Sequence, residues 1–175
     1  LIDEETKNIL IDFDGVIVDS NIFKEQAIKK IILKHFYQNK NAIKAIDYFN
    51  KYAGMSREKK LAKFFDSKKV NLIMDEYAFL CKDFYEHAVP TFGAIDFLKN
   101  LEAKFPNLNL FILSGGEKDE ISFFLEKNSM MHFFEDLLCS EYTKSEHIEK
   151  NNFSSEDIFI GDSLSDLKAA KDKNL

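Results

Sequence analysis

The sequence predicts an α/β protein: a doubly wound parallel sheet with an all-helical segment inserted after the first strand. Three observations predict it. Short apolar runs of strand length alternate with helical patterns from residue 88 onward, after a first such run at residues 9–11. Residues 21–87 lack proline and repeat apolar residues at helical spacing. Polar residues directly follow three of the apolar runs, and the carboxyl ends of parallel strands share one edge of a sheet.

The composition is that of a globular protein with one core domain and room for a modest insertion. The chain has 175 residues, 45% of them hydrophobic, and a formal net charge of −6. No basic block stands out, so we expect no nucleic-acid partner. No apolar run approaches the ~20 residues that span a membrane, and the first residues lack the basic-then-apolar pattern of a signal peptide. We therefore expect a cytoplasmic protein without a membrane partner, and its oligomeric state stays open.

The first apolar run, residues 9–11, ends in two carboxylates, Asp12 and Asp14. Its short length and β-branched residues predict a buried strand. Alternate side chains of a strand share a face, so both carboxylates would point the same way and repel each other unless a divalent cation compensates. A polar turn is the alternative explanation. An EF-hand calcium loop is excluded, because it needs Gly and Glu where this chain has Ile17 and Phe23.

We interpret residues 21–87 as an inserted domain of about four helices, which leaves residues 1–20 and 88–175 for the core. Gly54 followed by Ser56 is typical of a helix end and a new N-cap. The apolar residues expected on the buried helix faces are Ala27, Ile28, Ile31, Ile32, Phe36, Ile43, Ile46, Phe49, Leu72, Ile73, Tyr77, Leu80, Cys81, Phe84 and Tyr85.

Helices and strands alternate in the rest of the chain. A helix is expected to start at Pro90-Thr91 and to end near Phe105. Further strands are expected at 108–113, 134–138 and 158–160, and further helices at 117–127, 144–150 and 165–173. The sequence stops straight after the last helix, where a doubly wound sheet normally adds a strand, so we expect the C-terminal part of the core to be missing.

Polar residues at three strand ends would meet at one site of this sheet. They are Asp12 and Asp14, Ser114-Gly115-Gly116, and Asp162 with Asp166. A serine and two glycines at a strand-to-helix turn form an anion site, although glycines there also have a plain turn explanation. Asp166 lies four residues beyond Asp162, so the two face the same way on the first helical turn. An Asp favoured by the helix dipole is the alternative for Asp166.

These residues resemble, in order and spacing, the signature motifs of the haloacid dehalogenase (HAD) superfamily. The matching segments are Asp12-Phe13-Asp14-Gly15-Val16 with Asp19-Ser20, the strand ending in Ser114, Lys144, and Gly161-Asp162-Ser163-Leu164-Ser165-Asp166. The resemblance covers nearly the whole chain. It implies a Rossmann-like core, and it places residues 21–87 where the family has its first-type helical cap.

The resemblance implies an enzyme, a Mg²⁺-dependent phosphatase that hydrolyses a small phosphorylated metabolite. Asp12 would attack phosphorus and form an aspartyl-phosphate. Asp14 would protonate the leaving alcohol and then activate water, and we expect burial and repulsion from Asp12 to raise its pKa for this role. Dehalogenase members lack the second carboxylate, so Asp14 favours phosphate ester chemistry.

The same resemblance implies a magnesium site with oxygen ligands only. Its ligands would be the Asp12 carboxylate, the Asp14 main-chain carbonyl and Asp162. Asp166 would support the site by holding a metal-bound water.

Further residues are assigned to the substrate. Ser114, Gly115 and Lys144 would bind the transferring phosphate, with Lys150 as a nearby rival for the lysine. Arg57, in a segment that resembles the cap loop facing the substrate, would bind a distal anionic group. A helix-start serine cap with an incidental arginine is the alternative there.

Two other functions stay open at this stage. A phosphomutase of the same fold would return the phosphoryl group to a second hydroxyl of a sugar phosphate. A non-catalytic binding or regulatory protein would keep the fold without the reaction.

Overall fold

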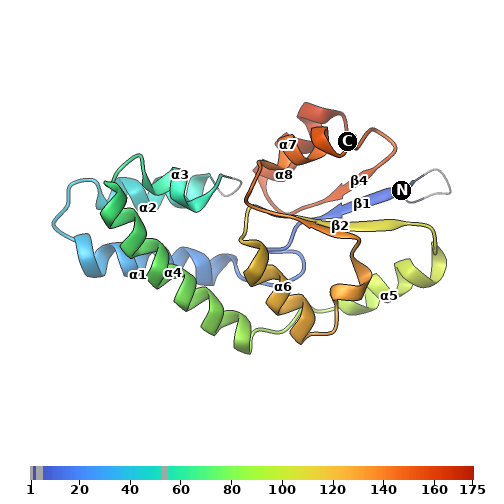
Figure 1. Cartoon of the computed structure of the whole chain (residues 1–175), viewed down its shortest axis with the longest axis horizontal. Helices are drawn as coiled ribbons and strands as arrows, with labels where there is room; N and C mark the ends of the chain where they lie inside the picture. Colours follow the sequence, from blue (N-terminus) through green and yellow to red (C-terminus); the bar gives the residue numbers. More distant parts are fainter. Residues whose placement is uncertain (1, 3–5, 53–54) are drawn as a thin grey trace.

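The sheet of this protein is parallel throughout. The computed structural model describes residues 2, 6–52 and 55–175, which form a four-stranded sheet in the order β3-β2-β1-β4 (Figure 1). The strands are β1 (Asn8–Ile11), β2 (Asn109–Leu113), β3 (Asp136–Leu138) and β4 (Ile158–Ile160). Each pairing between neighbours is parallel. The predicted α/β fold is confirmed.

Helices cover both faces of the sheet, as a doubly wound fold requires. They are α5 (Ala94–Lys104), α6 (Lys118–Lys127), α7 (Lys144–Lys150) and α8 (Leu164–Lys173), with a 3-10 turn at Met131–Phe133. Figure 1 shows α5 and α6 on one side and α7 and α8 on the other. Helix α5 starts later than expected from Pro90, because Gly93, with φ of +83°, caps it directly before Ala94.

Successive side chains of β1 point to opposite faces of the sheet and pack in two separate apolar clusters. Ile11 packs in the larger cluster, which includes Leu98 of α5. Leu10 points to the opposite face and packs with Ile148 of α7 and Ala169 of α8. Because β1 is buried on both faces at the centre of the sheet, the residues that follow it have a fixed position.

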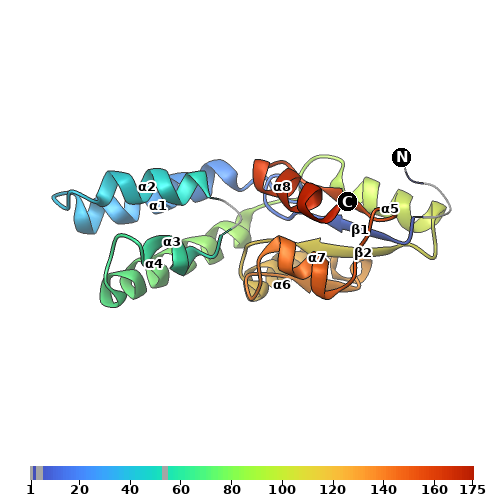
Figure 2. The same cartoon turned by 90° about the horizontal axis from the view of Figure 1, so that it is seen from above.

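The inserted segment forms a helical unit, defined here as α1–α4, beyond the carboxyl end of the sheet (Figures 1 and 2). Its helices are α1 (Asn21–Phe36), α2 (Ala42–Lys51), α3 (Arg57–Leu61) and α4 (Ser67–His87). They pack in a closed ring, α1 on α2, α2 on α3, α3 on α4 and α4 on α1. Although α4 is 21 residues long, no helix of the described parts of the chain is apolar enough to cross a membrane.

Most of the expected apolar stripes are buried, but two residues are not. Ile43 is 60% exposed and Leu72 is 40% exposed. In α2 the buried face is completed instead by Ala42 and Ala45, whose small side chains let the helix lie close to its neighbours. The predicted N-cap at Ser56 is confirmed, since its hydroxyl accepts from the Lys59 amide. The predicted helix end at Gly54 lies outside the described residues.

An aromatic cluster joins the helical unit to the core. Phe13 of the loop after β1 contacts Tyr85 of α4 and Phe124 of α6, with ring centres 5.7 and 5.4 Å apart. Tyr85 and Phe124 also contact each other, at 5.9 Å. All three side chains are fully buried, so this cluster fixes the loop after β1 against both parts of the molecule.

Replacing Phe124 should therefore destabilise the whole protein. We expect Phe124→Ala to lower the free energy of unfolding by about 3–5 kcal/mol, the usual effect of deleting a buried aromatic ring. Phe79→Ala is the matched control, since Phe79 is 72% exposed, and should change it by less than about 1 kcal/mol. Urea unfolding measures both, and equal effects would contradict this account of the cluster.

Candidate active site

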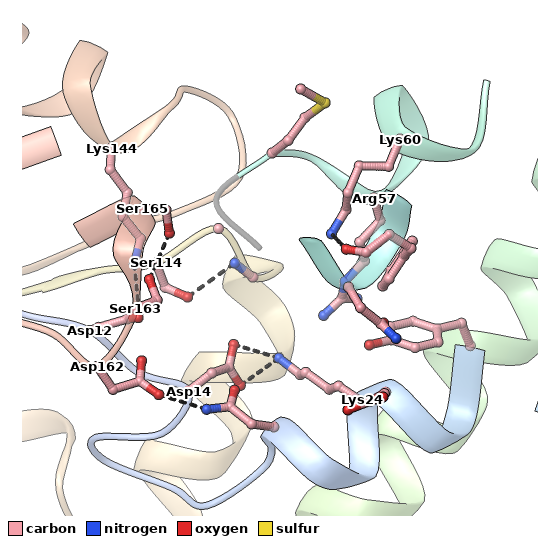
Figure 3. Close-up of a pocket in the computed structure, with 18 residues that line it drawn as sticks. Asp12, Asp14, Lys24, Arg57, Lys60, Ser114, Lys144, Asp162, Ser163 and Ser165 are labelled. Atoms are coloured by element: carbon pink, nitrogen blue, oxygen red, sulfur yellow. Dashed lines mark hydrogen bonds and ion pairs between the residues drawn. The ribbon is translucent and has the colours of Figure 1, made fainter. Parts of the chain in front are cut away.

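A cavity of about 250 Å³ lies between the carboxyl end of the sheet and the helical unit. In Figure 3 side chains from the strand ends stand on one side, and Lys24, Arg57 and Lys60 from the helical unit stand on the other. The residues predicted for the site that line the cavity are Asp12, Asp14, Arg57, Ser114, Gly115, Lys144 and Asp162.

The carboxyl ends of β1 and β4 lie side by side. The Asp12 amide donates to the Ile160 carbonyl at 2.8 Å. Gly15 has φ of +80°, a conformation that residues with a side chain rarely adopt. A Cβ atom there would lie 2.0 Å from Oδ2 of Asp162. Glycine is therefore required for Asp162 to approach the loop that carries Asp12.

Asp12 is buried with one carboxylate oxygen engaged. Its Oδ1 lies 2.9 Å from Lys144 Nζ and accepts from the Phe13 amide at 2.8 Å. Within the described residues, these polar contacts of the carboxylate all fall on Oδ1. Burial raises the pKa of Asp12 to about 7, and the Lys144 ammonium opposes that rise. The second oxygen is left available, as a carboxylate nucleophile requires.

Asp14 is held in its ionised form by three donors. Lys24 Nζ of α1 lies 2.5 and 2.6 Å from the two carboxylate oxygens. The hydroxyls of Ser20 and Tyr85 donate to Oδ1 at 2.5 and 3.2 Å. Burial acts to raise the pKa of Asp14, but the Lys24 ammonium and the Ser20 hydroxyl outweigh it, so the pKa is lowered. The sequence-based prediction that the pKa of Asp14 is raised is wrong. It did not take Lys24 of α1 into account.

Lys144 connects the carboxylate that follows β1 with a carboxylate in the first turn of α8. Its Nζ lies 2.5 Å from Oδ1 of Asp166 as well as against Asp12. Oδ2 of Asp166 accepts from the amide and the hydroxyl of Ser163, at 3.0 and 2.6 Å, in the capping box that starts α8. Lys150 is exposed and does not line the cavity. Of the two lysines that the sequence leaves open, Lys144 is the one that reaches the site.

Three carboxylates lie close enough to share one ion. Oxygens of Asp12, Asp162 and Asp166 lie within 4.8 Å of one another, and Asn21 of α1 donates to Oδ2 of Asp162 at 2.7 Å. In the part of the chain that the structure describes, Lys144 is the one lysine that contacts this group, so the cluster keeps a surplus of negative charge that a divalent cation would neutralise. The donors are hard oxygens, and the residues therefore fit Mg²⁺.

The end of β2 supplies the remaining wall of the predicted phosphate site. The buried Ser114 donates its amide to the Leu138 carbonyl of β3 at 2.9 Å, and its hydroxyl accepts from the Gly116 amide at 3.0 Å. Ser114, Gly115 and Gly116 all line the cavity. A hydroxyl and successive amides in such a turn form a concave site for an anion.

Arg57 enters the cavity wall from α3 but is engaged by the core. Its two terminal nitrogens each donate to one oxygen of Glu120 of α6, at 2.7 Å. Its guanidinium also lies 4.8 Å from the centre of the Tyr77 ring of α4. This buried, bidentate pair links the helical unit to the core, and it occupies the face of Arg57 that a distal anion would need.

Lys60, one turn further along α3, is a buried cation on the same wall. Its Nζ donates to the Phe49 carbonyl of α2 at 3.1 Å and lies 3.8 Å from the centre of the Phe49 ring. Burial, together with the nearby charges of Arg57 and Lys24, lowers the pKa of Lys60 to about 7. The ammonium is therefore a poorly compensated charge.

A comparison with protein families decides the identity of the chain. The family of haloacid dehalogenase-like hydrolases matches residues 9–175, which include every side chain described above. The chain belongs to this family. The resemblance found in the motifs is confirmed, and the protein is a hydrolase of the HAD type.

Solved structures show the same fold. A haloacid dehalogenase-like hydrolase from Streptococcus pneumoniae superposes with a TM-score of 0.70 at 20% identity, covering 98% of this chain and 82% of its own. A predicted phosphatase from Clostridium acetobutylicum gives 0.73 at 20% identity, covering 97% and 82%. A predicted phosphoglycolate phosphatase from Haemophilus somnus gives 0.70 at 14% identity, again covering 97% and 82%. No curated protein matches the sequence.

Four side chains of this HAD site were not predicted from the sequence. They are Asn21, Lys24, Lys60 and Glu120, and three of them belong to the helical unit. Each sits on an amphipathic helix among many similar polar residues, so no local pattern distinguishes them. Asn21, Lys24 and Lys60 reach the site because α1 and α3 pack over the carboxyl end of the sheet, and Glu120 of α6 joins it by binding Arg57.

The pair between Arg57 and Glu120 should respond to mutation as a buried ion pair. We expect Glu120→Gln to lower the free energy of unfolding by about 3 kcal/mol, because it leaves the Arg57 charge buried and unpaired. Lys34→Met, which breaks an exposed pair with Glu76, is the control and should cost less than about 1 kcal/mol. A loss of similar size in both variants, measured by urea unfolding, would count against a buried link.

The depressed pKa of Lys60 predicts a pH dependence of stability. Its pKa is about 7 in the folded protein and 10.5 when unfolded, so the unfolded chain binds more protons between these values. The Lys60 contribution is therefore destabilising below pH 7 and is relieved as the pH rises toward 10. From pH 7 to pH 9 wild type should gain about 2 kcal/mol more stability than Lys60→Met. If the free energies of unfolding of wild type and Lys60→Met changed equally with pH, the prediction would be wrong.

Proposed function

We propose that this protein is a Mg²⁺-dependent phosphomonoester hydrolase that acts on a small phosphorylated metabolite through an aspartyl-phosphate intermediate. One observation carries the proposal: Asp12, with one oxygen bound to Lys144 and the other available, lies in the same cavity as the Ser114 turn and beside the Asp162 carboxylate. Nucleophile, phosphate site and cation site are thus within reach of a single phosphoryl group. The phosphatases among the solved structures of this fold support the reaction class.

In the first step, the available oxygen of Asp12 forms a bond to phosphorus and the bond from phosphorus to the ester oxygen breaks. Lys144 holds Oδ1 at 2.9 Å and so orients the carboxylate, and its charge opposes the burial that raises the pKa of Asp12 to about 7. The leaving alcohol takes a proton from Asp14. In the second step, water attacks phosphorus, its proton passes to Asp14, and Asp12 is released with inorganic phosphate.

The Asp14 side chain is ready for the second of these steps. Ionised and bound by Lys24, it is the base that accepts a proton from water. To act first as an acid it must carry a proton, which requires the contact with Lys24 to loosen when substrate enters, since the ammonium lowers its pKa. Because Lys24 belongs to α1, proton transfer in this scheme depends on the position of the helical unit.

Charge on the transferring phosphoryl group would be balanced from three directions. Lys144, the Ser114 hydroxyl and the amides around Gly115 supply the protein's share. Asp12, the Asp14 main-chain carbonyl and Asp162 would hold Mg²⁺, with Asp166 as support, and the bound ion would neutralise phosphate oxygens. Arg57 remains a candidate for contact with the distal part of the substrate, provided that Glu120 releases it.

We assign residues 21–87 as a cap domain and residues 1–20 and 88–175 as the catalytic core. Support comes from the position of the helical unit over the cavity (Figures 1 and 2) and from the contacts of Lys24 and Arg57 with core carboxylates. Closure of the cap would exclude water during attack by Asp12, and opening would release the products.

Hydrolysis of a panel of phosphate monoesters with Mg²⁺ tests the proposal. We expect wild type to release inorganic phosphate and Asp12→Asn to lose at least about 10³-fold in kcat, because the amide cannot attack phosphorus. Asp172→Asn, which changes an exposed carboxylate of α8 outside the cavity, should keep wild-type activity. Removal of divalent cations with a chelator should abolish turnover.

Equal rates in wild type and Asp12→Asn would remove Asp12 from the mechanism. Isomerised sugar phosphate in place of inorganic phosphate would show a mutase instead of a hydrolase.

A further inference from the structure

The wall of the cavity opposite Asp12 is cationic. The helical unit places three positive side chains there, Lys24 from α1 and Arg57 and Lys60 from α3, and Figure 3 shows all three on the side away from the strand ends. Arg57 and Lys60 are buried, and their positive charge must be balanced, because an unpaired buried charge is strongly unfavourable. The partners of each cation therefore indicate which one is left for a ligand.

Two of the three cations are neutralised by the protein itself. Lys24 binds both oxygens of Asp14, and Arg57 binds both oxygens of Glu120. Each of these pairs is a complete match of one cation and one carboxylate. Neither requires a negative group from the substrate.

Lys60 has no such partner. Within the described residues its Nζ has no carboxylate oxygen within 4.0 Å, and its hydrogen bond goes to a neutral acceptor, the Phe49 carbonyl. The Phe49 ring beneath the ammonium compensates the charge only in part. An ammonium carries three donors, so donors remain for a ligand in the cavity that Lys60 lines.

We propose that Lys60 determines substrate specificity by binding a second anionic group, a carboxylate, on the part of the metabolite remote from the phosphate. A carboxylate matches one ammonium in charge, and the bidentate fork of Arg57, which would suit a second phosphate better, is occupied by Glu120. This inference rests on the proposed function, since it takes the Asp12 end of the cavity as the phosphate site. The lowered pKa of Lys60 agrees with a site whose charge is completed by its ligand.

Binding of two phosphonates that differ only at the remote end tests the inference without relying on turnover. The probes are 3-phosphonopropionate, which carries a carboxylate, and propylphosphonate, which carries a methyl group there, titrated calorimetrically at pH 6.5 with Mg²⁺ present. We expect wild type to bind 3-phosphonopropionate at least about 10-fold more tightly, as one buried charged contact implies.

Substitutions assign this preference to one side chain. In Lys60→Met and Lys60→Gln the two affinities should differ by less than about 2-fold, with propylphosphonate bound as in wild type. Lys59→Met, which removes the exposed lysine next to it on α3, should keep the full preference.

The possible outcomes separate this inference from the proposed reaction. Equal affinities in wild type, no binding of either phosphonate, or a preference that survives both substitutions at Lys60 would each overturn it. A preference that depends on Lys60 in a protein that hydrolyses no phosphate monoester would support the anion site and refute the reaction. Hydrolysis that depends on Asp12, with equal affinities for the two phosphonates, would support the reaction and refute the anion site.

Discussion

The contact of the Lys144 ammonium with Asp12 and Asp166 is the interaction on which the site depends. It lies at the carboxyl edge of the sheet, where three chain segments distant in sequence meet, and every partner is buried. Two carboxylates this close would not both ionise without a cation between them. Lys144 supplies that charge from α7, whose position is fixed by packing against α8 and the sheet. Apolar packing of the α/β core therefore positions Lys144, and Lys144 in turn orients Asp12.

The same principle of matched charges extends from the core to the helical unit. Lys24 on α1 meets Asp14, and Arg57 on α3 meets Glu120 on α6. These contacts place the helical unit over the strand ends in the arrangement of Figure 2. In the proposed mechanism, movement of the helical unit would affect proton transfer, because displacement of α1 would remove Lys24 from the Asp14 carboxylate. Among the three cations that the helical unit places in the cavity wall, Lys60 has no carboxylate partner within the described residues, which is why we propose that it binds the substrate.

The fold was largely predictable because its signals are local. Strand ends at Asp12, Ser114 and Asp162 are marked by an abrupt change from apolar to polar residues, and β1 is too short and too apolar for a helix. The partners of the site were not predictable, since they depend on which helix surface packs over the sheet. Helical spacing also did not predict every buried residue. Ile43 was expected on the buried face of α2, but Ala42 and Ala45 are buried there instead. The pKa of Asp14 was not predictable either, because burial, which raises it, is outweighed by Lys24 and Ser20, and no motif marks Lys24.

The central claim is that the carboxylates at the sheet edge are gathered to hold a divalent cation. Calorimetric titration of wild type and Asp162→Asn with Mg²⁺ tests it most directly, with Asp172→Asn, an exposed carboxylate of α8, as the control. The account predicts one bound ion per chain in wild type and in the control, and affinity weakened at least about 10-fold in Asp162→Asn. Mg²⁺ binding that is as tight in Asp162→Asn as in wild type would contradict it.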